Sequence, residues 1–271
     1  MTSPAVIAAL IALFTWWFFT GAILLAIRHS ERAGGSARLS CTLWALPLLL
    51  AGTGGFWVSL TLTTPGAAIV AFLSALLIWG WIELAFLAGM ITGPNLRECP
   101  DNLPGWERFV RAWGTVAYHE MLLLLVMVVM LLLAHNAPNP FGAWVFATLY
   151  GARVSAKLNL FLGVPRINLE FIPQVLGHLA SHFRIARLNW LFPISVTFLT
   201  VMTVIWWMKL STADTAQAAA GYALLTALTA LALLEHWLMV LPLPDAKLWR
   251  WMLPAPPKKT NVARPEVPHA L

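Results

Sequence analysis

The chain has 271 residues, of which 60% are hydrophobic and only 10% are charged, and its mean hydropathy is +0.77. A soluble domain carries about 25% charged residues, because its surface faces water. The composition therefore excludes an ordinary soluble domain and predicts a single helical domain in a lipid bilayer. The net charge of +6 does not indicate nucleic-acid binding, because the basic residues lie between apolar runs rather than together on one soluble element.

Seven apolar runs are long enough to cross a membrane. A transmembrane helix needs about 20 apolar residues to span about 30 Å of hydrocarbon. The fifth run is interrupted by Arg153 and Lys157, and the second contains Gly52, Gly54 and Gly55, which allow close helix approach or a local kink. The sequence predicts an all-α bundle of seven transmembrane helices over residues 1–241. The runs cover residues 4–27, 41–62, 67–91, 112–134, 141–161, 190–209 and 217–241.

The basic residues predict the orientation of this bundle. Every Lys and Arg except Lys209 lies in or beside the first, third or fifth connection, or in the C-terminal tail. Because Lys and Arg are enriched in cytoplasmic loops, the pattern predicts an N-terminus outside and a C-terminus in the cytoplasm. The residues are Arg28, Arg32, Arg38, Arg97, Arg108, Arg111, Arg153, Lys157, Arg166, Arg184, Arg187, Lys247, Arg250, Lys258, Lys259 and Arg264.

Two segments do not fit a membrane span. Within the connection 162–189, residues 168–187 carry apolar side chains at helical spacing, which predicts an amphipathic helix on the cytoplasmic face. Its apolar positions are Ile172, Val175, Leu176, Leu179 and Phe183. Residues 242–271 contain seven prolines and cannot form a core, so we expect a Pro-rich cytoplasmic tail.

Ionisable residues inside the apolar runs form a predicted polar layer. Each costs at least about 2.5 kcal/mol in a membrane, so each requires a structural or functional reason. With the orientation above and a rise of about 1.5 Å per residue, all of them lie within roughly 8–12 Å of the cytoplasmic boundary. The residues are Glu83, His119, Glu120, Arg153, Glu235 and His236. We therefore expect four helices to turn polar faces inward at one level.

This layer has three interpretations. In a charge-compensated core, Arg153 pairs with a carboxylate and the histidines hydrogen-bond to the others. A di-metal site is less favoured, because each adjacent Glu/His pair points its side chains about 100° apart on a helix. A single imidazole, His119 or His236, could instead be the axial ligand of a chlorophyll-type magnesium. His178 and His182 have a spacing that could hold a metal, although a solvated interfacial face accounts for them better.

Known catalytic motifs are missing from the sequence. It contains no GxGxxG, P-loop, GxSxG or HExxH motif and no set of histidine boxes. We therefore assign no catalytic residue and no metal ligand. The residues alone predict a seven-helix membrane protein with a polar layer near its cytoplasmic face.

One stretch nevertheless carries a family resemblance. The sequence Ser155-Ala-Lys-Leu-Asn-Leu-Phe-Leu-Gly-Val-Pro165, continued by Arg166-Ile-Asn-Leu-Glu-Phe-Ile-Pro173 and Leu179-Ala-Ser-His-Phe183, resembles the PuhE family. This is the family of photosynthetic complex assembly protein 2 from anoxygenic phototrophic bacteria. Trp16-Trp17-Phe18-Phe19-Thr20-Gly21, Trp81-Ile-Glu83 and Tyr118-His-Glu120 are also similar to it.

The resemblance implies a multi-pass protein of the bacterial cytoplasmic membrane. It would support assembly of the photosynthetic reaction centre and core light-harvesting complex, with nascent subunits as partners and bacteriochlorophyll as a candidate cofactor. In that context His119 and His236 are the candidate pigment ligands. The candidate partner-binding residues are Asn159, Pro165, Asn168, Glu170 and Pro173. The alternative is a metal-dependent membrane enzyme of pigment or lipid metabolism that uses the Glu/His layer.

Overall fold

The computed structural model describes residues 3–242, and this part of the chain is helical. The α-helices are α1 (Pro4–Ala33), α2 (Ala37–Trp44), α3 (Leu46–Ser59), α4 (Pro65–Leu87), α5 (Gly105–Ala134), α6 (Phe141–Leu162), α7 (Leu191–Ser211) and α8 (Ala216–Leu238). Two 3₁₀ segments, η1 (Leu169–Phe171) and η2 (Gln174–His182), lie between α6 and α7. An isolated bridge between Val164 and Ile185 is the only β pairing in residues 3–242, so the all-α prediction is confirmed. The predicted tail lies outside the described residues, apart from Pro242.

Six helical segments are long and apolar enough to cross a membrane: α1, α2 with α3, α4, α5, α7 and α8. Their ends lie within a few residues of the predicted runs, except where α1 and α5 extend further into the connections. The α6 helix has 22 residues, but it carries Arg153 and Lys157 and is not among the six. The structure thus confirms a multi-pass membrane protein, while the seventh span and the orientation remain predictions.

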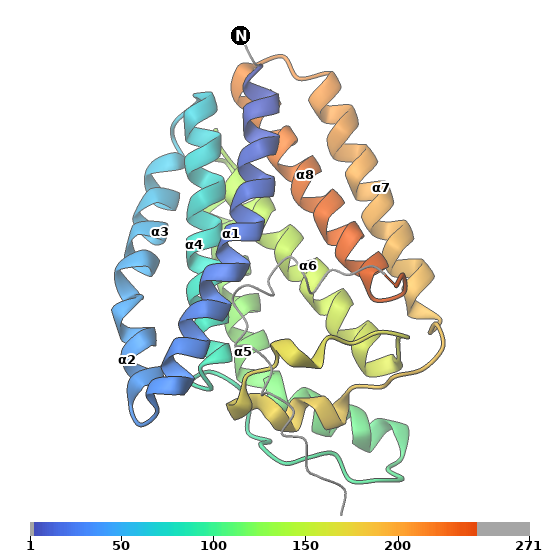
Figure 1. Cartoon of the computed structure of the whole chain (residues 1–271). Coiled ribbons are helices and arrows are strands. Elements are labelled where there is room, and N and C mark those ends of the chain that lie inside the picture. Colours follow the sequence, from blue (N-terminus) through green and yellow to red (C-terminus); the bar gives the residue numbers. More distant parts are fainter. Residues whose placement is uncertain (1–2, 243–271) are drawn as a thin grey trace, which may run out of the picture.

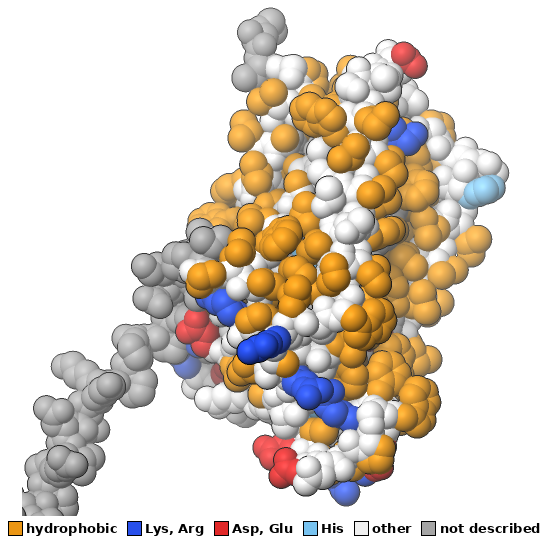
Figure 2. Space-filling model, turned by 90° about the vertical axis from the view of Figure 1, so that its right-hand side faces the viewer, with side chains coloured by type: hydrophobic (Ala, Val, Ile, Leu, Met, Phe, Trp, Pro, Cys, Tyr) orange, Lys and Arg blue, Asp and Glu red, His pale blue; other side chains and the backbone are white. Residues whose placement is uncertain are grey.

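The helices form a bundle whose basic connections gather at one end (Figure 1). The α1–α2, α4–α5 and α6–α7 connections lie at the end opposite the N-terminus. More than half of the apolar stretch of α4 and of α8 is buried, whereas less than a third of it is buried in α1, α5 and α7. Figure 2 shows hydrophobic side chains over the middle of one face and Lys and Arg side chains toward the end that carries these connections. This is the surface expected of a protein surrounded by lipid.

Small residues allow α3 and α4 to pack closely. A Cβ on Gly52 would lie 2.9 Å from the Leu77 Cβ, and one on Gly55 would lie 2.5 Å from the Ser74 Oγ. A Cβ on Gly54 would meet nothing within 4 Å. Two of the three predicted glycines therefore face the neighbouring helix, and the third does not.

The connection 163–189 differs from its prediction. Instead of one amphipathic α-helix on the membrane surface, it contains two 3₁₀ segments separated at Ile172 and Pro173. The residue before a proline is restricted to extended backbone, and Ile172 has φ −76° and ψ 122°. Leu176 and Leu179 are buried against Phe86 of α4. The predicted apolar face exists, but it packs on the protein itself.

Asn189 fixes the end of this connection. Its Oδ1 accepts hydrogen bonds from the backbone N–H groups of Leu191 (2.9 Å) and Phe192 (3.0 Å), which caps the start of α7. Its Nδ2 donates to the carbonyl oxygen of Gly163 (2.7 Å) and to Oδ1 of Asn159 (3.1 Å). One side chain thereby ties the end of α6 to the start of α7.

Candidate functional site

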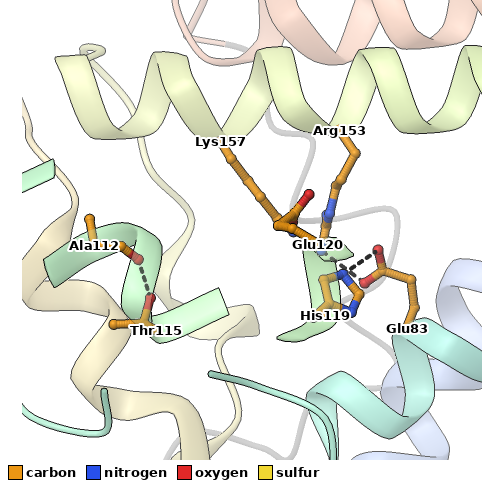
Figure 3. Close-up of polar contacts among 7 residues, drawn as sticks. All are labelled: Glu83, Ala112, Thr115, His119, Glu120, Arg153 and Lys157. Carbon is orange, nitrogen blue, oxygen red and sulfur yellow. Dashed lines mark hydrogen bonds and ion pairs between the residues drawn. The ribbon is translucent and has the colours of Figure 1, made fainter. Parts of the chain in front are cut away.

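Glu83 is the centre of a charged cluster built by α4, α5 and α6. Its Oε2 accepts a hydrogen bond of 2.9 Å from Nη2 of Arg153, and its Oε1 lies 3.7 Å from Nε2 of His119 (Figure 3). Glu83 is only 6% exposed, whereas the Arg153 side chain is 39% exposed. The arginine pairs with a carboxylate, as the charge-compensated interpretation predicts.

A second ion pair lies beside the first. Lys157, one helical turn after Arg153 on α6, donates to Oε1 of Glu120 on α5. The Lys157 ammonium also lies 5.3 Å from the centre of the Phe86 ring, a cation–π contact. Lys157 interrupts the same apolar run as Arg153, and its spacing of four residues places both side chains on one face of α6.

His119 is fully buried within this cluster. Its ring packs against Phe86, with the ring centres 4.3 Å apart. Among the described residues, neither ring nitrogen has a hydrogen-bond partner. The backbone N–H of His119 donates to the carbonyl oxygen of Thr92 (3.0 Å), which joins α5 to the connection after α4.

The two predicted residues on α8 do not join the cluster. Glu235 accepts a 2.8 Å hydrogen bond from Nε1 of Trp16 on α1. The His236 ring is 1% exposed, with its Nε2 2.9 Å from the Ser155 hydroxyl and its Nδ1 2.8 Å from the Ala232 carbonyl oxygen. Adjacent residues on a helix point in different directions, so Glu235 contacts α1 while His236 contacts α6. Trp16 and Ser155 were not predicted, and their residue types are ordinary in apolar helices.

A cavity of about 620 Å³ lies next to both the charged cluster and Glu235. It lies between α1, α4, α5, α6, α8 and the α6–α7 connection, and most of its lining is apolar. Glu83, Glu120, Arg153, Lys157 and Glu235 supply charged groups to its wall. The volume is in the range of about 300–1,000 Å³ typical of small-molecule sites.

Neither candidate pigment ligand lines this cavity. His119 and His236 are enclosed behind its wall, whereas His182 on η2 is one of the lining residues. Burial lowers the pKa of His182; a hydrogen bond to the Arg97 carbonyl opposes this shift, and the charges of Arg108 and Arg111 add to it. Within residues 3–242, no group of three or more His, Cys, Asp and Glu residues is placed to share a metal ion.

The structure divides the candidate partner-binding residues into two sets. Asn159 is fully buried and donates to the Ser155 carbonyl and the Ser195 hydroxyl, each at 2.9 Å. Pro173 is also buried. Pro165, Asn168 and Glu170 are exposed on the α6–α7 connection, where a partner could contact them.

Comparisons with known proteins assign the chain to a family. A family model described as "Protein of unknown function (DUF3623)" matches residues 1–260. The chain is also 51% identical over 255 residues to the "Uncharacterized 30.4 kDa protein in puhA 5'region" of Rhodobacter capsulatus. That alignment covers 94% of this chain and 93% of its relative. No solved structure matches the chain.

Proposed function

The chain belongs to the DUF3623 family, and we propose that it is an assembly factor for the photosynthetic reaction centre and core light-harvesting complex in the bacterial cytoplasmic membrane. The observation that carries the proposal is its 51% identity to a protein whose name places it beside puhA, a photosynthesis gene. The resemblance of residues 155–183 to the PuhE family supports the same role. A protein with six helices long and apolar enough to cross a membrane is suited to partners that are themselves assembled in a membrane.

The proposed topology has seven spans, with the N-terminus outside and the C-terminus in the cytoplasm. The α6 helix, with 22 residues, reaches about 33 Å at about 1.5 Å per residue, enough to cross the hydrocarbon. It packs against α4, α5 and α8. Its two cations, Arg153 and Lys157, are paired with Glu83 and Glu120, which removes much of the cost of placing α6 in lipid.

The α6–α7 connection is the proposed contact surface for a nascent subunit. It exposes Pro165, Asn168 and Glu170, and the large apolar side chains of Ile185 and Leu188 are 69% and 50% exposed. Apolar side chains exposed beside polar ones are typical of a protein interaction site. Anchoring by Asn189 holds this surface in place before a partner arrives.

For bacteriochlorophyll, His119 suits the proposed ligand role better than His236. Both ring nitrogens of His236 contact a hydroxyl or carbonyl oxygen, whereas those of His119 have no hydrogen-bond partner among the described residues. The His119 ring is enclosed, so pigment binding requires it to turn toward the cavity. No specific observation within residues 3–242 favours the metal-dependent enzyme.

Gene deletion in a phototrophic host tests the assembly role. We expect membranes of the deletion strain to lose reaction-centre and core-antenna absorbance, and the wild-type gene to restore it. Undiminished absorbance in the deletion strain, under conditions that induce photosynthetic membranes, would refute the proposal.

Site-specific photocrosslinking tests the contact surface. A photoreactive amino acid at Glu170 should crosslink to a reaction-centre or antenna subunit. The same amino acid at Asp214, exposed between α7 and α8 at the other end of the bundle, is the matched control and should not. Equal crosslinking at both positions would argue against a specific surface on the α6–α7 connection.

A further inference from the structure

The cavity between α1, α4, α5, α6 and α8 is apolar over most of its wall. Trp16 and Phe19 line it from α1, Trp79 from α4, Leu149 from α6 and Leu231 from α8. Such a surface favours an apolar chain or ring over water, because removing its own apolar area from water is favourable by about 25 cal/mol per Å². The surrounding bilayer is the natural supply of such molecules.

Carboxylate oxygens on this wall lack hydrogen bonds. Oε1 of Glu83 and Oε2 of Glu120 are buried, and each accepts no hydrogen bond within the described part of the chain. Glu235 receives a hydrogen bond from Trp16, and no Lys or Arg of residues 3–242 lies within ion-pair distance of it. Glu83 and Glu120 thus each keep one buried acceptor without a hydrogen bond, whereas Glu235 lines the cavity with an exposed carboxylate that no cation of residues 3–242 pairs with.

The Lys and Arg side chains that line the cavity donate hydrogen bonds to protein groups. Arg153 and Lys157 donate to Glu83 and Glu120, and Arg166 donates to the carbonyl oxygens of Leu238 and Leu241. Within residues 3–242, the Nε of Arg153 and the Nδ1 of His182 are the buried nitrogens of the lining residues without a hydrogen-bond partner. Glu83 and Glu120 are each paired with a cation, so Glu235 is the carboxylate of this wall that has no cation partner within residues 3–242.

We infer that the cavity binds a membrane-soluble amphiphile with an apolar body and a head group that donates hydrogen bonds, either a hydroxyl or an ammonium group. The head lies at Glu235, and the apolar body lies along α1 and α8. An amphiphile with a carboxylate head is disfavoured, because it would place a second negative charge beside Glu235. This inference rests on the cavity and does not depend on the proposed role in assembly.

Photoaffinity labelling of the full chain in lipid nanodiscs tests the inference. Three alkyl probes of equal length carry a diazirine on the chain and end in an alcohol, an amine or a carboxylic acid. We expect the alcohol, the amine or both to label peptides of α1, α4 and α8 at least tenfold more than the acid does. A preference between the two active probes identifies the hydroxyl or the ammonium source. Equal labelling by all three probes, or labelling confined to α2, α3 and α7, which do not line the cavity, would overturn the inference.

Variants separate head-group recognition from simple partition into lipid. Glu235→Gln should reduce the preference for the alcohol or amine probe over the acid probe several-fold. Glu107→Gln, which removes a surface pair with Arg111, should leave this preference unchanged. Ala152→Phe, which narrows the cavity from α6, should lower labelling by every probe. Because Glu235 is exposed to the cavity, its variant remains informative even if substitution of the buried Glu120 prevents folding. An unchanged preference in Glu235→Gln would contradict the inference.

Discussion

The buried charge of Glu83 is compensated by residues from two other helices. Arg153 donates to one of its oxygens, and His119 lies beside the other. A carboxylate that is 6% exposed cannot be solvated by water, so its charge is compensated by these neighbours and by the nearby Lys157. Removing one member of such a buried pair costs about 3–5 kcal/mol, because the other charge is left uncompensated.

The two members of this pair should respond differently to substitution. Arg153→Met leaves Glu83 charged in an apolar setting and should lower the free energy of unfolding by about 3–5 kcal/mol. Glu83→Gln should cost less, because the 39% exposed Arg153 side chain can turn away from the buried site. The double variant should recover part of the loss. Thermal unfolding in detergent micelles measures all three, and additive losses would show that the pair is not coupled.

The sequence predicted the charges of this cluster better than their partners. Arg153 and Glu83 stand out because an ionised side chain in an apolar run requires compensation. Trp16, which donates to Glu235, and Ser155, which contacts His236, cannot be recognised in this way. Tryptophan and serine are common in membrane helices, and only the packing of α1 and α6 against α8 brings them to these partners.

The buried His182 side chain should make the stability of η2 depend on pH. Its pKa is lowered by burial, so below about pH 6.5, the ordinary value for histidine, the unfolded segment binds more protons than the folded one. Stability is therefore present at neutral pH and is lost as the pH falls through this range, by up to about 1.4 kcal/mol per unit. After correction for the intrinsic exchange rate at each pH, we expect the backbone amides of residues 174–183 to exchange hydrogen faster at pH 5 than at pH 7.

A His182→Asn variant should lose most of that pH dependence. The matched control is His135→Asn at the exposed end of α5, which should exchange in residues 174–183 as the wild type does. A pH response that persists in His182→Asn would assign it to another group of the segment, such as His178, whose pKa burial also lowers.

At the scale of elements, the close packing of α3 and α4 predicts a contrast between neighbouring glycines. Gly52→Val would place its Cβ against Leu77 and the Ser74 carbonyl, so it should force the helices apart and destabilise the protein by about 1–3 kcal/mol. Gly54→Val changes helix propensity in the same way but meets no neighbour. Thermal unfolding of both variants gives the comparison, and equal losses would show that close packing at Gly52 is not the cause.

The connection 163–189 shows why its secondary structure could not be predicted from periodicity. The apolar residues Ile172, Val175, Leu176, Leu179 and Phe183 do share one surface, as the pattern indicates. The 3₁₀ form and the docking onto Phe86 arise from tertiary packing at the ends of α4 and α5, which the local pattern does not contain. The sequence therefore predicted which side chains are covered, but not what covers them.

At the scale of the whole molecule, α6 links the polar cluster to the topology. Residues 141–161 form one of the seven apolar runs of the sequence, but α6 carries Arg153 and Lys157 and is not among the six helices apolar enough to cross a membrane; both cations are paired with carboxylates of α4 and α5. A helix whose charges are neutralised within the bundle can enter lipid with its neighbours, although it would insert poorly alone. The same contacts therefore decide whether the bundle has six or seven spans.

Cysteine accessibility distinguishes these two topologies. In a chain whose Cys41 and Cys99 are replaced by serine, a single cysteine is introduced at Asn136, before α6, or at Arg187, after it; both positions are exposed. If α6 crosses the membrane and the N-terminus is outside, a membrane-impermeant maleimide should label Asn136→Cys in intact cells and Arg187→Cys only after permeabilisation. Labelling of both positions from the same side would mean that α6 does not cross.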